Sequence, residues 1–392
     1  MEVSALKSNV EMKIPFVQLG DIISLSKGKK HEPIGNGKNR YINIENLHNS
    51  ANSLFTNEEG TFVVEDDLII AWDGANAGKV GVGFVGVIGS TLARMRIKSP
   101  DVSPRYLFWY LESINESIKS QRTGATIPHV NGNSLKEIQI PLPPLSTQKR
   151  IAEILDAADA LRRKDQELLK KYDELAQAIF IDMFGDPVKN EKGWEKVKLS
   201  HFIARLETGV SVNSNDDIFS GDKKCVLKTS CVYTGYFSDN EAKVISPSDL
   251  VRAKLNPVRD SIIISRMNTR ELVGMSAYIE KDYPNLFLPD RLWMTVKSDN
   301  PHSSLWLSFA LKSFAIREQI QKIASGTSGS MKNISKKDFL EIEVINPPCK
   351  LQRTFEDALK KINELKKKSE INNEDILFNS LIQKAFNGEL VS

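Results

Sequence analysis

The chain has 392 residues, of which 41% are hydrophobic and 26% charged, and its formal net charge is +3. These values are typical of a folded protein with room for two or three domains, and they exclude a largely disordered chain. Because the net charge is nearly zero, a nucleic-acid surface would have to come from local clusters of Lys and Arg. The three cysteines, Cys225, Cys231 and Cys349, form no CxxC pair, which favours a reduced, cytoplasmic setting. We expect no signal peptide and no membrane span.

Short β-branched and aromatic runs occupy the first third of the chain. FVQL (16–19), RYINI (40–44) and DLIIAW (67–72) are separated by Gly, Asn, Asp and Pro, a pattern typical of strands and loops. One amphipathic helix is predicted at about 104–120. We interpret residues 1–145 as a mixed α/β domain.

A long helix follows, and we expect it over 146–186. Pro144 cannot donate a ladder hydrogen bond, and Ser146 or Thr147 can cap the first helical turn. Gly185 and Pro187 end the helix. Apolar residues at alternate steps of three and four predict a packed seam that is broken once, by Asp165. The seam residues are Ile151, Ile154, Leu161, Asp165, Leu168, Tyr172 and Leu175.

The same order of segments is then repeated. DLIIAWDGAN (67–76) resembles DSIIISRMNT (260–269), and SPRYLFWYL (103–111) resembles SSLWLSFAL (303–311). The junction EIQIPLPPLSTQ (137–148) resembles EIEVINPPCKLQ (341–352). The repeat predicts a second mixed α/β domain over 187–348, with a helix at about 303–323, and a distal long helix over 349–392.

The distal helix has a poorer seam, which includes Ile362, Leu365, Ser369 and Ile376. Two half-apolar helices in one chain most simply pair antiparallel, with a globular domain at each end. Asp165 and Ser369 are equivalent positions of the repeat. We predict that they face each other as a polar, register-setting layer; a local dip in packing is the alternative.

Two motifs resemble catalytic or cofactor sites only superficially. GVGFVG (81–86) fits GxGxxG, but strands surround it rather than a βαβ unit, so tight turns are the better interpretation. NPPC (346–349) lacks the aromatic residue that stacks on a flipped base in adenine methyltransferases, and it lies at a junction. The five histidines are scattered, no P-loop is present, and we expect no metal site, cofactor or catalytic residue in this chain.

Basic and amide side chains recur in loops of both copies. Lys and Arg can hold phosphates, while Asn, Arg and His can read base edges. In the first copy the candidates are Lys27, Lys29, Lys30, Lys38, Arg40, Asn43, Asn46, Asn76, Lys79, Arg122, Thr123, Thr126, His129 and Asn131. In the second copy they are Lys223, Lys228, Arg266, Asn268, Arg270, Arg291, Thr327, Lys332 and Asn333. Any one of them is more often a solvated loop residue, but their recurrence in comparable places favours DNA binding.

These features together resemble the specificity subunit of a type I restriction–modification system. The run IQIPLPPLSTQKRI (138–151) follows the family pattern "I-P-L-P-P-L-x-x-Q-x-x-I", and TGATIPHVN (123–131) is similar to its Gly/Thr-rich loop. DLIIAWDGANAGKVG (67–81) resembles another recurrent segment more loosely, and NPPC departs from the pattern at the second junction.

The resemblance implies two target recognition domains, each reading one half of a bipartite double-stranded DNA site. Two conserved helices would set the spacer and dock two modification (methyltransferase) subunits, which recruit endonuclease subunits. S-adenosylmethionine, Mg and ATP would then bind those partners. Three alternatives stay open at this point: the recognition subunit of a related methyltransferase–nuclease without a translocating motor, a coiled-coil protein-interaction scaffold, and a stand-alone methyltransferase.

Overall fold

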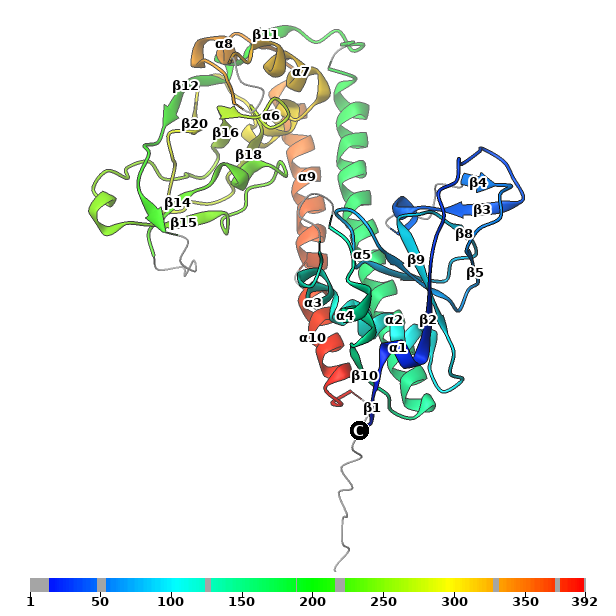
Figure 1. The fold of residues 1–392 in the computed structure, drawn as a ribbon. Helices are drawn as coiled ribbons and strands as arrows, with labels where there is room; N and C mark the ends of the chain where they lie inside the picture. The colour runs from blue at the N-terminus through cyan, green and yellow to red at the C-terminus, as the bar shows by residue number, and fades with distance from the viewer. Residues whose placement is uncertain are drawn as a thin grey trace, which may run out of the picture. The chain divides into compact units, whose positions relative to one another are not determined.

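A computed structural model describes residues 14–47, 54–123, 128–187, 189–215, 223–326, 331–370 and 374–390. The chain forms two compact units (Figure 1). The first unit comprises residues 1–167 and 370–392, and the second comprises residues 168–369. Each unit therefore combines one α/β domain with parts of the long helices.

The first unit contains two four-stranded sheets. An antiparallel sheet has the order β2 (Ile23–Lys27), β9 (Leu92–Ile97), β6 (Leu68–Ala71) and β7 (Val80–Val82). A mixed sheet has the order β4 (Leu54–Thr56), β3 (Asn39–Ile42), β8 (Gly86–Ile88) and β5 (Phe62–Val63), with β3 and β8 parallel. β6 is buried along its whole length, as its unbroken apolar run predicts. Together the sheets confirm the predicted mixed α/β domain.

Short helices surround these sheets. They are α1 (Leu19–Ile22), α2 (Pro104–Ser113), α3 (Asn115–Ser120) and α4 (Gly132–Lys136), while β1 (Phe16–Gln18) pairs with β10 (Gln139–Pro141). The single helix predicted at 104–120 is therefore wrong, because the chain leaves helical geometry at Ile114. The Asn115 side chain donates to the Gly78 carbonyl at this break and turns α3 onto the sheet.

The second unit repeats the antiparallel sheet strand for strand and shares three strands of the mixed sheet, whose fourth strand lies at opposite edges in the two units. Its antiparallel sheet has the order β12 (Ile203–Thr208), β20 (Leu292–Lys297), β16 (Ile262–Ser265) and β18 (Ser276–Tyr278). Its mixed sheet has the order β13 (Ser214–Asn215), β15 (Ala242–Ile245), β14 (Cys225–Leu227) and β19 (Leu286–Phe287), with β14 and β19 parallel. β11 (Lys196–Lys198) pairs with β22 (Glu343–Ile345). The order of equivalent strands confirms the internal repeat inferred from the sequence.

The second unit also carries α6 (Ser304–Leu311), α7 (Phe314–Ile323), α8 (Lys336–Leu340) and the 3₁₀ turns η2 (Leu199–His201), η3 (Thr229–Val232) and η4 (Pro247–Asp249). The helix predicted at 303–323 is thus two helices, with the break at Lys312 and Ser313. A short pair of strands, β17 (Met267–Asn268) and β21 (Lys332–Asn333), has no counterpart among the named strands of the first unit. The first unit has one 3₁₀ turn, η1 (Ile44–Leu47).

The GxGxxG run forms a strand–turn–strand rather than a cofactor loop. Gly83 has φ of +81° in the turn between β7 and β8. A Cβ at Gly86 would lie 2.3 Å from the carbonyl oxygen of Arg40, and one at Gly81 would lie 2.5 Å from Leu47. The glycines are therefore required for close strand packing, as the sequence predicts.

The central helix α5 (Leu145–Phe184) has 40 residues and is ~60 Å long. The C-terminal segment forms α9 (Cys349–Glu370) and α10 (Glu374–Phe386). In the second unit Phe184 stacks on Phe355, while Asp173, three turns earlier in α5, binds Lys366, three turns later in α9. This register makes α9 antiparallel to α5 there, as predicted.

The packed face of α5 lies one residue later than the predicted seam. Leu155 and Phe180 are fully buried, whereas the predicted seam residues Leu161, Leu168 and Leu175 are 58%, 37% and 47% exposed. Ile151 is buried as predicted, and Ile154 and Tyr172 are half-buried. The assignment of those three leucines to helix packing is wrong, because the small and aromatic residues Ala176, Phe180 and Phe184 face the core instead.

The seam of α9 is shifted in the same direction. Ile362 is buried as predicted, but Leu365 is 44% exposed while the neighbouring Lys366 is only 8% exposed. The ammonium of Lys366 binds Asp173 at 2.7 Å and lies 4.1 Å from the centre of the Tyr236 ring, so this lysine is buried with partners. The prediction that Leu365 packs in the seam is therefore wrong.

The predicted layer of Asp165 and Ser369 joins residues of different units and stays a prediction. The Ser369 hydroxyl donates to the Leu365 carbonyl of its own helix at 3.3 Å. The side chain of Ile376 lies outside the described residues. The predicted domain boundaries at 145, 186 and 348 also remain predictions.

Candidate nucleic-acid interface

Five of the candidate residues of the first copy gather where β2 and β6 end. The loop 128–131 runs along the end of β6, because Val130 donates to the Trp72 carbonyl and Gly74 donates to the Pro128 carbonyl. Lys27 pairs with Asp73 at 2.8 Å. This first polar cluster, which we define by its side chains, comprises Lys27, Asp73, Asn76, Arg122, Thr123 and His129.

Arg122 has two guanidinium nitrogens without a hydrogen-bond partner among the described residues. Its Nη1 donates to the Ala75 carbonyl at 3.3 Å. Its Nε and Nη2 atoms are buried, and neither finds a partner within the described parts of the chain. A guanidinium held at one nitrogen with free donors at the others can form a bidentate pair with the O6 and N7 atoms of guanine or with a phosphate.

Several other candidates of the first copy lie elsewhere or are already engaged. Lys29 and Lys30 are exposed after the end of β2. Arg40 belongs to β3 of the mixed sheet, and Lys38 directly precedes that strand. Lys79 is half-buried beside Glu112, and burial lowers its pKa. The first polar cluster is therefore smaller than the sequence suggests.

Three asparagines of the first copy stabilise local turns. Asn43 accepts hydrogen bonds from the amides of Glu45 and Asn46, and Asn131 caps α4. Asn46 is 3% exposed and bonds the Asn43 amide, so the suggestion that it reads a base is wrong. Thr126 lies outside the described residues.

The second polar cluster occupies the equivalent strand ends of the second unit. Arg266 donates to the Asp290 carbonyl at 2.6 Å and to Asn333 Oδ1 at 3.3 Å. Asn333 and Lys332 lie opposite Met267 and Asn268 in the β17–β21 pair. We define this cluster as Arg266, Asn268, Arg291, Lys332 and Asn333, of which Arg291 is exposed and adjoins Arg266 through its backbone.

A tyrosine that sequence reasoning did not find orients Asn268. The Asn268 amide donates to Tyr233 Oη at 2.7 Å, and Tyr233 Oη also bonds Thr229 Oγ1 at 2.8 Å. The carboxamide oxygen of Asn268 accepts from the Thr269 amide. Tyr233 and Asp73 could have been recognised only from tertiary contacts, since neither has a basic or repeated sequence pattern.

The remaining candidates of the second copy line the approach to this cluster. Lys223 and Arg270 are exposed, and Lys228 is half-buried with its ammonium 3.9 Å from Glu241. Thr327 lies outside the described residues. The structure thus brings Arg266, Asn268, Arg291 and Lys332 together and leaves the other lysines as peripheral charges.

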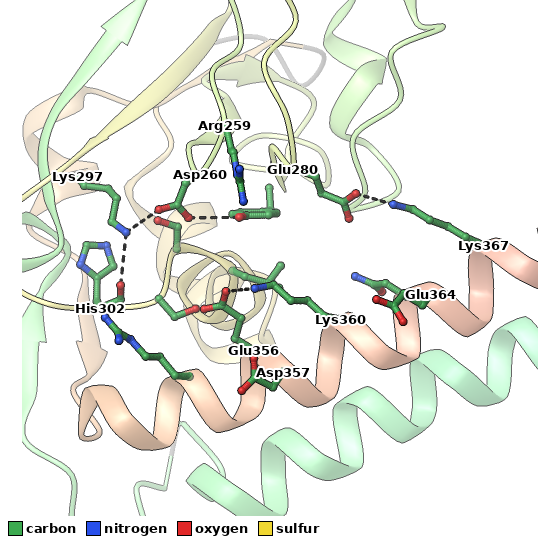
Figure 2. A pocket seen from close by; sticks show the side chains of 16 residues that line it. Arg259, Asp260, Glu280, Lys297, His302, Glu356, Asp357, Lys360, Glu364 and Lys367 are labelled. Carbon is green, nitrogen blue, oxygen red and sulfur yellow. Dashed lines mark hydrogen bonds and ion pairs between the residues drawn. The ribbon is translucent and has the colours of Figure 1, made fainter.

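A charged cleft of about 640 Å³ also lies in the second unit, between the antiparallel sheet and α9 (Figure 2). Lys297 pairs with Asp260 at 2.7 Å, and ion pairs also join Glu356 to Lys360 and Glu280 to Lys367. Burial disfavours the charged form of Glu356, but hydrogen bonds from Lys360 and Ser303 prevail and lower its pKa. Because its acids are paired with lysines, the cleft provides structural ion pairs rather than a general acid or base.

A partly exposed cation–aromatic cluster ties a recognition-domain loop to the helices of the second unit. Tyr236 Oη donates to Asp173 at 2.6 Å, and the ammonium groups of Lys366 and Lys312 lie 4.1 and 4.6 Å from the centre of its ring. Burial lowers the pKa of Lys312 to about 8. The two lysines share one ring and one carboxylate, and Lys366 already pairs with that carboxylate. The charge of Lys312 therefore lowers the stability of the folded chain.

We therefore expect Lys312→Met to raise the melting temperature by about 3 °C at pH 7. The folded pKa lies below the unfolded one, so the unfolded chain binds more protons between about pH 8 and 10.5. Wild-type stability should rise over that window, and the advantage of the variant should shrink toward pH 10. Scanning calorimetry at pH 7, 8.5 and 10 tests this, with the exposed Lys337→Met as control. An advantage that is the same at all three pH values would contradict it.

The described residues contain no group of three His, Cys, Asp or Glu side chains placed to hold a metal ion. Within the same residues, none of the helices combines the length and apolar character needed to cross a bilayer. The two polar clusters can act through hydrogen bonds and charge. Two repeated α/β domains, each with a polar cluster at equivalent strand ends, define the class of nucleic-acid recognition proteins.

Several known proteins are similar to this chain in sequence or in fold. A model of the type I restriction modification DNA specificity domain matches residues 10–171. The MjaVIII specificity subunit of Methanocaldococcus jannaschii is 26% identical over 89% of this chain and 86% of its own length. The EcoKI specificity subunit of Escherichia coli K12 is 24% identical over 93% and 86%. The S subunit from M. genitalium has the same fold, with a TM-score of 0.62 and 19% identity over 96% of this chain and 97% of its own.

The chain is thus similar along most of its length to type I restriction enzyme specificity subunits, and its first part matches their DNA specificity domain. The resemblance noted in the junction and the Gly/Thr-rich loop is thereby confirmed.

Proposed function

We propose that this chain is the DNA-recognition subunit of a type I restriction–modification enzyme and reads a bipartite double-stranded site. The observation that carries the proposal is the duplication of the polar cluster. Asp73 follows β6 in one unit, and Arg266 and Asn268 follow the equivalent strand β16 in the other. The loop before α4 brings Arg122 and His129 to the first of these places, and the loop before α8 brings Asn333 to the second. Two equivalent surfaces on one chain suit two half-sites on one DNA.

The chemistry of the clusters suits the reading of base edges. Arg122 and Arg266 match the acceptor pair of guanine, and Asn268 matches the donor–acceptor pair of adenine. The Asp73 carboxylate can accept from the amino group of cytosine, with Lys27 holding it in place. Lys29, Lys30, Lys223 and Arg270, exposed around the clusters, supply phosphate contacts.

The exposed leucines of α5 fit the docking of modification subunits. Leu161, Leu168 and Leu175 recur every seven residues and so lie along one helix face. In the first unit an apolar groove of about 410 Å³ between α5 and α10 adjoins Leu161. We assign this stripe to two modification subunits, through which endonuclease subunits join. S-adenosylmethionine, Mg and ATP then bind the partners, and the assembly acts in the cytoplasm.

Replacing Lys29 and Lys30 by Ala should weaken binding to every DNA sequence by a similar factor. Each lost phosphate contact lowers the slope of log affinity against log salt by about 0.9, so the slope should fall by up to about 2. Fluorescence anisotropy at several salt concentrations measures this. The pair Lys149→Ala and Lys164→Ala, both exposed on α5, controls for net charge. Loss of discrimination at one base with an unchanged slope would refute the phosphate assignment.

The proposal as a whole is tested by selecting bound DNA from a random library with the chain alone and with its modification subunits. We expect two short specified blocks separated by an unspecified spacer, with affinity that falls as salt rises. Absence of DNA binding in both preparations would favour the coiled-coil scaffold. Binding of S-adenosylmethionine by the isolated chain in calorimetry would favour a stand-alone methyltransferase. A bipartite motif with modification subunits but no ATP-driven translocation would indicate the related methyltransferase–nuclease.

A further inference from the structure

A buried glutamine occupies the same place at both junctions of the chain. Gln148 in α5 and Gln352 in α9 are 0% and 1% exposed. Each lies four residues after the last proline of its junction, and each ends the repeated motif. A fully buried carboxamide must find partners for its donors and acceptor, so its contacts show what it holds together.

The two carboxamides form the same contacts in both units. Gln148 Oε1 accepts from the Ser103 amide at 2.9 Å, and Gln352 Oε1 accepts from the Ser303 amide at 3.0 Å. Gln148 Nε2 donates to the Pro143 carbonyl, and Gln352 Nε2 donates to the Pro347 carbonyl, both at 2.8 Å. Gln148 Nε2 also donates to the Asp101 carbonyl at 2.9 Å.

These contacts join the long helix to one helix of the recognition domain, α2 in the first unit and α6 in the second. Ser103 and Ser303 are the N-cap residues of α2 and α6, whose buried faces pack on the sheets. One side chain therefore connects the long helix, the proline segment before it and the start of a helix that belongs to the domain. Hydrogen bonds are directional, whereas apolar packing alone permits sliding and rotation.

A second contact one to two turns along the long helix completes each attachment. In the first unit Asp156 accepts from Trp109 Nε1 at 2.8 Å and pairs with Arg105, both on α2. In the second unit Glu356 accepts from the Ser303 hydroxyl. Two fixed points along a helix define both the position of a domain and its rotation about that helix.

We infer that Gln148 and Gln352 are positioning residues for DNA recognition: each fixes its recognition domain on the long helix and so sets the half-site spacing. The inference rests on the proposed function. A small rotation at the junction moves the distant polar cluster by a larger distance, because the domain acts as a lever. Neither glutamine belongs to a polar cluster, so their loss alters geometry rather than base contacts.

The first test measures geometry without DNA. Spin labels on Glu45→Cys and Lys164→Cys, both exposed positions of the first unit, report the distance from domain to helix in a Cys349→Ser background. We expect one narrow distance in the otherwise wild-type chain and a clearly broader distribution with Gln148→Met. The core variant Ile70→Val, remote from the junction, should lower the melting temperature without broadening the distance. An unchanged distribution in Gln148→Met would overturn the inference.

The second test measures spacing on DNA. With the selected target, Gln148→Met should reduce by about tenfold the preference for the native spacer over one longer by a base pair, while Ile70→Val retains it. Retention of the full preference in Gln148→Met would also overturn the inference. If the wild-type chain prefers no spacer, that result counts against the proposed function. The distances between the spin labels would still show whether Gln148 fixes the recognition domain on the helix.

The second copy gives an independent trial if Gln148→Met does not fold. Gln352→Met is measured with labels on the exposed positions Asn240 and Lys361, and Ile264→Val is its control. Gln148→Glu keeps the acceptor for Ser103 but places a buried carboxylate oxygen against the carbonyls of Pro143 and Asp101. We expect a broadened distribution with Gln352→Met and with Gln148→Glu; a distribution as narrow as that of wild type in both variants would overturn the inference.

Discussion

Replacing Leu168 and Leu175 by Asp is expected to abolish assembly with the modification subunits while the chain itself stays folded. Burial of each leucine at an interface stabilises it by about 1.5–3 kcal/mol, and each aspartate adds the cost of burying a charge. The combined loss corresponds to a decrease in affinity of at least about 100-fold. Co-purification and sedimentation velocity with the modification subunits measure the effect.

The matched control for this variant lies on the opposite face of the same helix. Gln166 and Gln177 are exposed, and each lies two residues from one of the leucines, about 200° around the helix. Gln166→Asp with Gln177→Asp changes the net charge equally and should assemble normally. Equal assembly by the leucine variant and by wild type would show that the stripe is not the docking surface.

Lengthening the helices is expected to lengthen the DNA spacer. A seven-residue insertion after Asp165, matched by seven residues between α9 and α10, preserves the packed faces, because seven residues return nearly to the same side of a helix. The insertion adds about 10 Å, which corresponds to ~3 base pairs of B-DNA. Selection from libraries with spacers of different lengths measures the shift.

The control inserts seven Gly and Ser residues into a loop of the second recognition domain, after the exposed Asn240, and leaves the helices unchanged. This variant should retain the wild-type spacer. A helix-extended chain that selects the unchanged spacer would show that helix length does not set the spacing.

The repeat was the most informative feature of the sequence, because it exposed the architecture without any single strong motif. The order of strands around DLIIAW (67–72) and DSIII (260–264) is the same in both units. Residues with alternating or unbroken apolar patterns form strands wherever a sheet can bury them, so local pattern and tertiary structure agree there.

The buried faces of α5 and α9 lie one residue later than the predicted seams. The hydropathy of a residue does not include the partners that the fold provides for its charge. Leu365 is more apolar than Lys366, yet Lys366 is buried, since Asp173 and Tyr236 satisfy its charge. Likewise the exposed Leu168 and Leu175 signal a surface that a partner can cover. The sequence of one chain does not show whether an apolar helix face packs within that chain or against another protein.

The candidate interface was predicted by residue type, and the structure reduced it by geometry. Arg122 and His129 come together in the first unit, and Arg266 and Asn268 come together in the second. By contrast, Asn46 is buried in a turn and Lys79 lies beside Glu112. Loop composition cannot reveal which side of a sheet a side chain occupies. The role of Gln148 and Gln352 was also missed, although the same residue at the end of two repeated junctions was a visible signal.

The central claim is that each unit reads its own half of a bipartite site. The most direct measurement compares the motifs selected from a random DNA library by the wild-type assembly, by Arg122→Ala and by Asn268→Ala. We predict that Arg122→Ala relaxes one or two positions of one block and leaves the other block unchanged, and that Asn268→Ala does the converse. Relaxation of the same block by both variants, or a single continuous motif in wild type, would contradict the claim.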